Sequence, residues 1–167
     1  MNLLRTSLLA VALCASMMSC SKDESVAIEE LNYTIDLNLA HETNWELADS
    51  ILILINDHRA SLGYAPLKRD QQYASAFAVD HTKYMIGQSR ISHDNFEVRK
   101  QALKNRGAKL VTENVAFGYQ TAASVVHAWL NSPGHRRNIE SDFTHAGFGI
   151  IADERGNYYF TNIFYRK

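Results

Sequence analysis

The chain has 167 residues, which is enough for one globular domain preceded by a targeting segment and a linker. Hydrophobic residues make up 46% and charged residues 21%, values that are normal for a soluble domain with a core. The 17 basic and 18 acidic residues nearly balance, so the composition predicts no nucleic-acid partner, and no apolar run after the N-terminus approaches the roughly 18 residues that span a bilayer.

The N-terminus has the order of a secretory signal peptide. Arg5 is followed by an apolar run over residues 8–13 and then by small residues, and such a segment is removed from the mature protein. Residues 17–20 resemble a lipobox, after which a cysteine, here Cys20, is acylated and becomes the first residue; Met17 departs from the usual Leu. The alternative is an ordinary cleaved signal with a chance cysteine.

The residues around Cys20 indicate the destination of such a lipoprotein. Residues 21–24 resemble the signal that sends Bacteroidetes-type lipoproteins to the outer cell surface. We therefore expect a signal peptide over 1–19, a Cys20 that carries fatty acid (palmitate), and a lipid anchor in the outer membrane at the cell surface. Cys14 lies inside the signal, so the folded part has no cysteine and must be stable through its core alone.

Residues 20–42 are predicted to be a tether, because they are polar and follow no sustained period apart from a short strand that residues 33–37 could form. The folded domain is predicted over 43–167. Thr43 and Glu46 match a capping box at the start of a first helix, which Gly63 would end.

Two features describe the rest of the predicted secondary structure. Residues 51–55 are apolar on every side of the first helix, which predicts burial from more than one direction. Apolar spacing and turn residues then predict helices over 70–86, 95–106 and 121–130 and strands over 109–112, 147–152 and 158–165. Residues 155–157 signal a hairpin between the last two strands, so helices precede an antiparallel hairpin in an α+β arrangement.

Three polar clusters carry the chemistry, over residues 91–94, 112–118 and 129–139, and each places a titratable residue at the end of an element or in a loop. In the third cluster Pro133 and Gly134 are predicted to break the helix, so that the imidazole of His135 projects from a turn. Two histidines and one glutamate brought together could bind a divalent metal or exchange protons. Their spacing alone does not predict that they converge.

The order of motifs resembles the CAP superfamily, which comprises cysteine-rich secretory, antigen 5 and pathogenesis-related 1 proteins, and its bacterial branch most closely. The resemblance spans about residues 45–166. Its motifs are Asn56-x-x-Arg59, Ser92-His93, Glu113-Asn114-Val115-Ala116, the block from Ala128 to Ile139 that contains Ser132-Pro133-Gly134-His135-Arg136, Thr144-x-x-Gly147-x-Gly149, and the segment from Tyr158 to Phe164. It implies a three-layer α-β-α sandwich, a small antiparallel sheet between helices, with an open cleft.

The resemblance also implies which residues line that cleft. Matched by motif, they are His93, Glu113 and His135, and the supporting residues are Asn114, Ser132 and Arg136. Animal members have a second glutamate in the cleft and can hold zinc there. This chain has Ser132 at that position, so His93 and His135 would hold a divalent metal only weakly, and no cofactor is expected to be required.

Structural interpretations compete with these functional ones. Glu113 could satisfy backbone donors or orient an imidazole instead of transferring a proton. His58 and His81 follow the apolar positions of their helices and are predicted to be packed rather than ligating. Trp129 and the aromatic residues near the C-terminus are predicted to be core rather than a ligand platform.

Three functions stay open at this point. The first is a binding module that captures an extracellular lipid, glycan or cell-wall fragment, or peptide. The second is a hydrolase, either a metal-assisted peptidase or a wall-directed enzyme; the sequence has no Gly-x-Ser-x-Gly motif, no His-Glu-x-x-His motif and no cysteine nucleophile in the folded part. The third is a structural or interaction domain whose cleft is vestigial.

Overall fold

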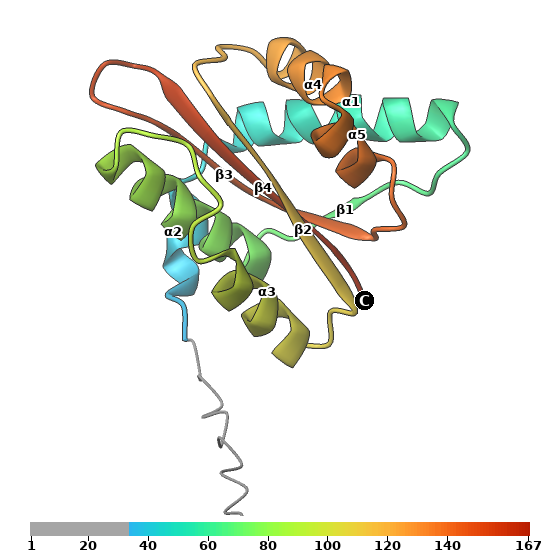
Figure 1. Cartoon of the computed structure of the whole chain (residues 1–167), viewed down its shortest axis with the longest axis horizontal. Coiled ribbons are helices and arrows are strands. Elements are labelled where there is room, and N and C mark those ends of the chain that lie inside the picture. Colours follow the sequence, from blue (N-terminus) through green and yellow to red (C-terminus); the bar gives the residue numbers. More distant parts are fainter. Residues whose placement is uncertain (1–33) are drawn as a thin grey trace, which may run out of the picture. The chain divides into compact units, whose positions relative to one another are not determined.

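The computed structural model describes residues 34–167, so the predicted signal peptide, Cys20 and the tether up to residue 33 lie outside the described residues. In chain order the elements are η1 (Leu37–Glu42, a 3-10 helix), α1 (Trp45–Ser61), β1 (Lys68–Arg69), α2 (Tyr73–Gly87), α3 (Phe96–Asn105), β2 (Leu110–Phe117), α4 (Ala122–Asn131), α5 (Pro133–Ile139), β3 (His145–Ala152) and β4 (Tyr158–Arg166) (Figure 1). None of the helices within residues 34–167 is long and apolar enough to cross a bilayer.

The four strands form one sheet in the order β1-β3-β4-β2. The predicted hairpin of β3 and β4 is antiparallel, and β2 pairs antiparallel with β4, with Glu113 opposite Ile163 and Asn114 opposite Asn162. The two-residue β1 runs parallel to β3, whereas a wholly antiparallel sheet was expected. As the last strand in this order, β2 has one edge that no strand of the described residues covers.

Helices cover both faces of the sheet, with α2 and α3 on one side and α1, α4 and α5 on the other (Figure 1). Alternate residues of a strand point to opposite faces, and β4 supplies both cores. Phe160 and Phe164 lie in the core with α1 and α4, whereas Ile163 and Tyr165 lie in the core with α2 and α3. This arrangement confirms the predicted α+β fold with its α-β-α layers.

Two glycines of β3 allow α2 to lie directly on the sheet. A Cβ atom at Gly147 would lie 2.5 Å from the carbonyl carbon and Cβ of Ala74, and one at Gly149 would lie 2.2 Å from the carbonyl oxygen of Ala78. Such distances are shorter than any real Cβ contact, so only glycine fits at either position. The Gly147-x-Gly149 motif thus fixes the spacing between helix and strand.

The start of the domain differs from the prediction. Residues 33–37 contain no strand in the part that the structure describes, and Leu37–Glu42 forms the 3-10 helix η1, in which Ala40 is buried. The side-chain oxygen of Asn44, not of Thr43, accepts the amide hydrogen bond that caps α1. The packed unit therefore begins before residue 43, within the segment predicted as a tether.

Thr43 has a different role because β1 is too short to pair with the whole of β3. Its hydroxyl donates to the carbonyl oxygen of Phe148 over 3.0 Å and accepts from the amide of Ile150 over 2.8 Å. The amide of Asn44 donates to the carbonyl oxygen of Ile150 over 3.0 Å. The chain before α1 therefore satisfies backbone groups at the edge of β3 that a longer β1 would otherwise pair.

Helix α1 is buried along one side rather than from several directions. Ile51 and Ile55 are fully buried, but Ile53 is 60% exposed, so the apolar run at 51–55 only partly faces the core. The helix ends as predicted before Gly63, which has a φ of +80°. Arg59 is buried and donates to four carbonyl oxygens, of Ala65, Ile139, Ser141 and Phe143, so it ties α1 to the neighbouring segments.

Candidate functional site

Glu113 lies in the middle of β2 with its side chain on the face covered by α2 and α3, and it is 4% exposed. Arg99 of α3, also buried, binds it in a bidentate manner: Nε donates to Oε2 and Nη2 donates to Oε1, both over 2.9 Å. His93 donates from Nδ1 to Oε1 over 2.9 Å. Burial raises the pKa of Glu113, but the hydrogen bond from His93 and the charge of Arg99 outweigh it and lower the pKa, so the carboxylate is ionised.

His93 lies in the loop between α2 and α3, and hydrogen bonds fix the conformation of this loop. The loop residue Asp94 accepts from the Tyr84 hydroxyl over 2.8 Å through its carboxylate and from Nη1 of Arg99 over 2.8 Å through its carbonyl oxygen. Asn95 adopts the left-handed region, with a φ of +57°, and leads into α3. With Nδ1 of His93 donating to Glu113, Nε2 is the atom left to accept a proton or bind a ligand, and the side chain is 52% exposed.

His81 of α2 lies beneath this pair. It is 2% exposed, and its Nε2 donates to the carbonyl oxygen of Ser92 over 2.8 Å, as expected of a packed histidine. Its Nε2 is also 3.8 Å from Oε1 of Glu113, so it borders the site without hydrogen bonding to the carboxylate. Burial lowers the pKa of His81, which keeps the ring neutral.

His135 approaches from the other face of the sheet. As predicted, α4 ends before Pro133, but His135 does not lie in a turn: Pro133 occupies the first position of the short helix α5, where its missing amide hydrogen costs nothing. The side chain of Asn114, fully buried on that face of β2, donates to the carbonyl oxygen of His135 over 3.1 Å. Burial and the charge of His93 lower the pKa of His135, so its imidazole is neutral at neutral pH.

The uncovered edge of β2 separates the two histidines. Side chains replace a strand partner along this edge: Asn138 donates to the carbonyl oxygen of Glu113 over 3.3 Å, and Nε1 of Trp129 donates to that of Val115 over 3.3 Å. Because neighbouring residues of β2 point to opposite faces, Glu113 faces His93 while Asn114 faces α5. The candidate site therefore extends around a sheet edge.

A hollow of about 370 Å³ lies along this edge, and we call it the edge pocket. Its walls come from the loop after α2, from β2, and from α4 and α5. The residues that line it are Ser89, Arg90, Ile91, Val115, Ala116, Phe117, Tyr119, Ala128, Trp129, Ser132, His135 and Tyr159. Most of them are apolar, and Ile91 and Phe117 are themselves 47% and 44% exposed.

The predicted site residues thus occupy different positions. His135 and Ser132 line the edge pocket, whereas Glu113 is buried outside its lining and His93 lies outside it. Trp129, predicted to be core, is 2% exposed yet borders the pocket. Arg136 lies farther along α5 and pairs with Glu140 over 2.7 Å, where the carboxylate also contacts His58 over 2.8 Å.

Arg99, which holds Glu113 in place, was not predicted from the sequence. It sits in a charged stretch that is typical of a solvated face, with Glu97 and Lys100 beside it. Its spacing could have indicated that Arg99 is buried, because Phe96, Arg99 and Leu103 lie three and four residues apart on one side of α3.

The side chains do not fit a closed zinc site. Among residues 34–167 no three His, Cys, Asp or Glu side chains lie together in a way that could hold a metal ion. Both oxygens of Glu113 are engaged by Arg99 and His93. A divalent ion would have only His93 and His135 as protein ligands, whereas structural zinc sites have four and catalytic ones three.

Comparisons with known proteins agree with this fold. A solved extracellular protein of Bacillus anthracis that contains an SCP domain aligns with a TM-score of 0.63 at 28% identity, over 75% of this chain and 41% of that one. A solved outer surface protein of Borrelia burgdorferi aligns with a TM-score of 0.66 over 73% of this chain and 93% of that one; at 21% identity, this likeness concerns the fold alone.

Sequence comparison adds the family. The uncharacterized protein YkwD of Bacillus subtilis is 33% identical over 107 residues, 60% of this chain, and the match spans 41% of the length of that protein. The model of the cysteine-rich secretory protein family, CAP, matches residues 52–164. With the fold and motifs described above, this match shows that the chain belongs to the CAP family.

Proposed function

We propose that this protein is an exported binding module that captures an extracellular ligand in the edge pocket. The observation that carries the proposal is an apolar hollow of about 370 Å³ that is bordered by a neutral imidazole, His135, at an uncovered strand edge. Mostly apolar walls with a few polar groups are typical of small-molecule sites. The ligand's apolar group would lie against Trp129 and Tyr159, and its polar group would bond to His135 and Nε2 of His93.

The candidate ligands are a lipid, a glycan or cell-wall fragment, and a peptide. The state of Glu113 favours binding over proton transfer, because a buried, ionised carboxylate with both oxygens engaged orients His93 and does not contact a ligand. Ser132, in place of a second carboxylate, supplies a hydroxyl at the pocket wall. A divalent metal at His93 and His135 stays a prediction, and binding does not require it.

The test is equilibrium binding of a fatty acid, a muramyl peptide and an apolar peptide to the full chain. We expect saturable binding of at least one probe, weakened about tenfold or more in the double variant His93→Ala with His135→Ala, since each lost hydrogen bond costs about 1 kcal/mol or more. His127→Ala is the matched control, because His127 is exposed on α4 and does not line the pocket. Saturable binding that the double variant leaves unaltered would refute this proposal and favour a vestigial cleft.

A hydrolase is the second candidate, and the hydrogen bond of 2.9 Å between His93 and Glu113 favours it. A carboxylate that accepts from Nδ1 in this way fixes the orientation of the imidazole and leaves Nε2 to accept a proton, as a general base requires. Hydrolysis of peptides or peptidoglycan that His93→Ala abolishes would establish this function. If the full chain processes neither substrate, with or without added zinc, the hydrolase is excluded for those substrates.

We further propose that a lipid on Cys20 anchors the protein in the outer membrane, with the domain at the cell surface. The signal-like N-terminus supports this, and the solved Bacillus anthracis relative is described as extracellular. Labelling of cells with a fatty-acid probe should mark the wild type and not Cys20→Ser. Protease added to intact cells should degrade the domain only if it lies at the surface.

A further inference from the structure

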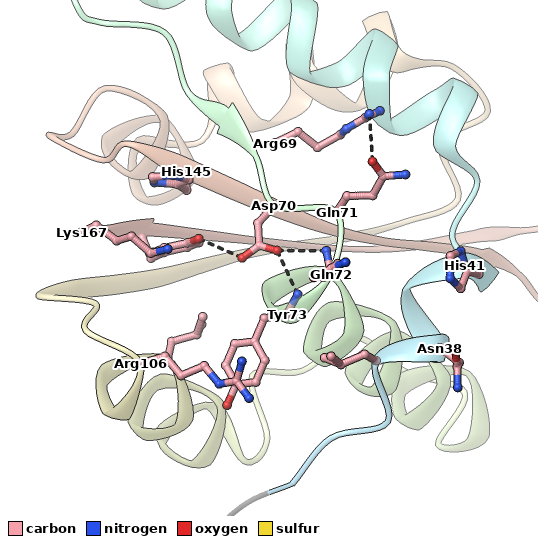
Figure 2. Close-up of a pocket in the computed structure, with 13 residues that line it drawn as sticks. Asn38, His41, Arg69, Asp70, Gln71, Gln72, Tyr73, Arg106, His145 and Lys167 are labelled. Carbon is pink, nitrogen blue, oxygen red and sulfur yellow. Dashed lines mark hydrogen bonds between the residues drawn. The ribbon is translucent and has the colours of Figure 1, made fainter.

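A second hollow lies apart from the edge pocket and shares no lining residue with it. It has a volume of about 850 Å³, and we call it the cationic pocket. η1, the turn from β1 into α2, the end of α3, the start of β3 and the end of β4 all contribute to it. Its lining residues are Leu37, Asn38, His41, Arg69, Asp70, Gln71, Gln72, Tyr73, Leu103, Arg106, His145, Tyr165 and Lys167 (Figure 2).

Asp70 is the one acidic side chain of this lining, and the protein itself satisfies it. Its Oδ1 accepts from the amides of Gln72 and Tyr73 over 3.0 and 2.9 Å, at the start of α2. Its Oδ2 accepts from the Tyr165 hydroxyl over 2.8 Å. Burial and this hydrogen bond raise the pKa of Tyr165, so the phenol stays neutral and keeps donating. Asp70 is therefore engaged by Gln72, Tyr73 and Tyr165 and not by the basic side chains of the lining.

The basic side chains of the lining are occupied to different degrees. Arg69 is fully engaged, because it pairs with Asp49, donates to Gln71 over 3.2 Å and lies over the ring of Trp45. Arg106 lies over the ring of Tyr73, with Cζ 3.8 Å from the centroid, and Lys167 lies near the ring of Tyr165. Neither Arg106 nor Lys167 has a carboxylate within 4.0 Å among the residues that the structure describes. Stacking leaves the edge of the Arg106 guanidinium, with its N–H donors, open to an acceptor.

Two histidines also line the pocket, on two sides of these basic groups. Figure 2 shows His145 beside Lys167, with Arg106 on the same side of Asp70 and His41 across the pocket. The ring of His145 stacks on Tyr165 and its Nδ1 contacts the Thr144 hydroxyl. Burial, followed by the charge of Lys167, lowers the pKa of His145, so its ring is neutral at neutral pH and offers a hydrogen bond rather than a charge.

This chemistry defines the class of ligand. Guanidinium and ammonium groups on separate walls suit a molecule with more than one phosphate, and arginine forms its strongest hydrogen bonds with such groups. The amides of Asn38, Gln71 and Gln72 can pair with hydroxyl groups between the phosphates. The volume falls within the range of small-molecule sites. We propose that the cationic pocket binds a phosphorylated sugar or polyol, either free or as the headgroup of a lipid.

The experiment measures binding of a glucose bisphosphate to the full chain by calorimetry, with glucose as the uncharged control. We expect saturable binding of the bisphosphate and none of glucose. Arg106→Gln should weaken binding about tenfold or more, Lys167→Gln should weaken it less, and Arg106→Lys should retain part of the affinity. Arg155→Gln is the matched control, because it removes the same charge in the β3–β4 turn, far along the chain from the lining.

The remaining arms identify the source of the ligand and the location of the site. Vesicles of phosphatidylcholine, with and without a phosphatidylinositol phosphate, test whether the pocket binds a lipid headgroup. If free glucose bisphosphate displaces the protein from the vesicles, one pocket binds both ligands. The double variant His93→Ala with His135→Ala should bind the bisphosphate as the wild type does, whatever becomes of the edge pocket. The proposal is overturned if neither probe binds, if Arg155→Gln weakens binding as much as Arg106→Gln, or if the histidine variant abolishes it. Thermal unfolding checks that the Arg106→Gln variant is folded. The Lys167→Gln variant tests the same pocket at an exposed residue, whose replacement leaves the fold intact.

Discussion

Glu113 connects more of the candidate site than any other single side chain does, since it contacts His93 and Arg99 and lies 3.8 Å from His81. Its charge is compensated chiefly by the buried Arg99, so breaking this pair leaves an uncompensated charge in the interior. Removing one partner of a buried ion pair costs about 3–5 kcal/mol. Replacing the Arg99–Glu113 pair by apolar residues as a whole would cost less than replacing either one.

The stability of the domain should therefore depend on pH through Glu113. Its pKa in the folded state lies below the ordinary value of 4.5, so the unfolded chain takes up a proton first as the pH falls. The stabilisation is complete above pH 4.5 and is lost as the pH falls through the lower folded value. Glu113→Gln should cost about 3 kcal/mol at pH 7 and progressively less toward pH 3.

Urea unfolding at a series of pH values measures this dependence. Glu97→Gln is the matched control, because Glu97 is exposed on α3 and pairs with Lys100 at the surface. A cost for Glu113→Gln that is equal at pH 7 and pH 3 would contradict the ionised cluster.

At the same scale, the sequence supports some site residues better than others. The motifs singled out His93, Glu113 and His135, and in the structure the segments that contain them lie along β2. They could not reveal that β2 lies at the sheet edge, nor that Glu113 and Asn114 point to opposite faces of it. Arg99 was hidden by its charged neighbours, because a buried arginine and a solvated one look alike until the partner carboxylate is known.

Among the elements, the contact between α2 and β3 leaves the least room for change. The backbone of α2 lies where a side chain at Gly149 would have to be. Gly149→Ala should therefore destabilise the protein by at least about 2 kcal/mol, because the helix must move away from the sheet to admit a methyl group. Thermal unfolding followed by circular dichroism measures this change.

Gly87 offers the comparison, because it is the last residue of α2 and a Cβ there would meet nothing within 4 Å. Gly87→Ala should be neutral or stabilise the protein by about 0.5–1 kcal/mol, since alanine loses less backbone entropy in a helix. Equal effects of the two substitutions would show that α2 can shift without cost.

The errors at the element scale have physical causes. A proline usually breaks a helix, which is why a turn is predicted at Pro133, but at the first position of a helix its fixed φ favours helix formation. Thr43 and Asn44 can both cap a helix, and only the unpaired edge of β3 decides that Thr43 is used elsewhere. Local sequence cannot resolve the second case, because the edge of β3 that engages Thr43 is distant in the chain.

For the molecule as a whole, the N-terminal boundary of the folded unit carries a further prediction. Nε1 of Trp45 donates to the carbonyl oxygen of Ala40 over 3.1 Å, and Lys83 of α2 pairs with Glu42. A chain that starts at residue 43 should be less stable, by at least about 2 kcal/mol, than one that starts at residue 34, because η1 no longer covers α2. Denaturant unfolding followed by tryptophan fluorescence compares the two; identical midpoints would show that η1 adds nothing.

The overall architecture was the part best supported by sequence. Apolar spacing located α4 and the hairpin of β3 and β4, and the motif order indicated the family that the comparisons then showed. The parallel pairing of β1 was not predictable, because two residues carry too short a pattern. The cationic pocket was equally hidden, since its basic residues come from five separate segments.

The uncovered edge of β2 has a consequence for how the two helical layers move. His93 belongs to the layer of α2 and α3 and His135 to the layer of α1, α4 and α5, so a ligand that bonds to both acts as a clasp between them. Amide hydrogen exchange would then slow together in the loop before α3 and in α5, although the chain between them is long. Ligand capture at this edge would in that case also join the layer of α2 and α3 to the layer of α1, α4 and α5.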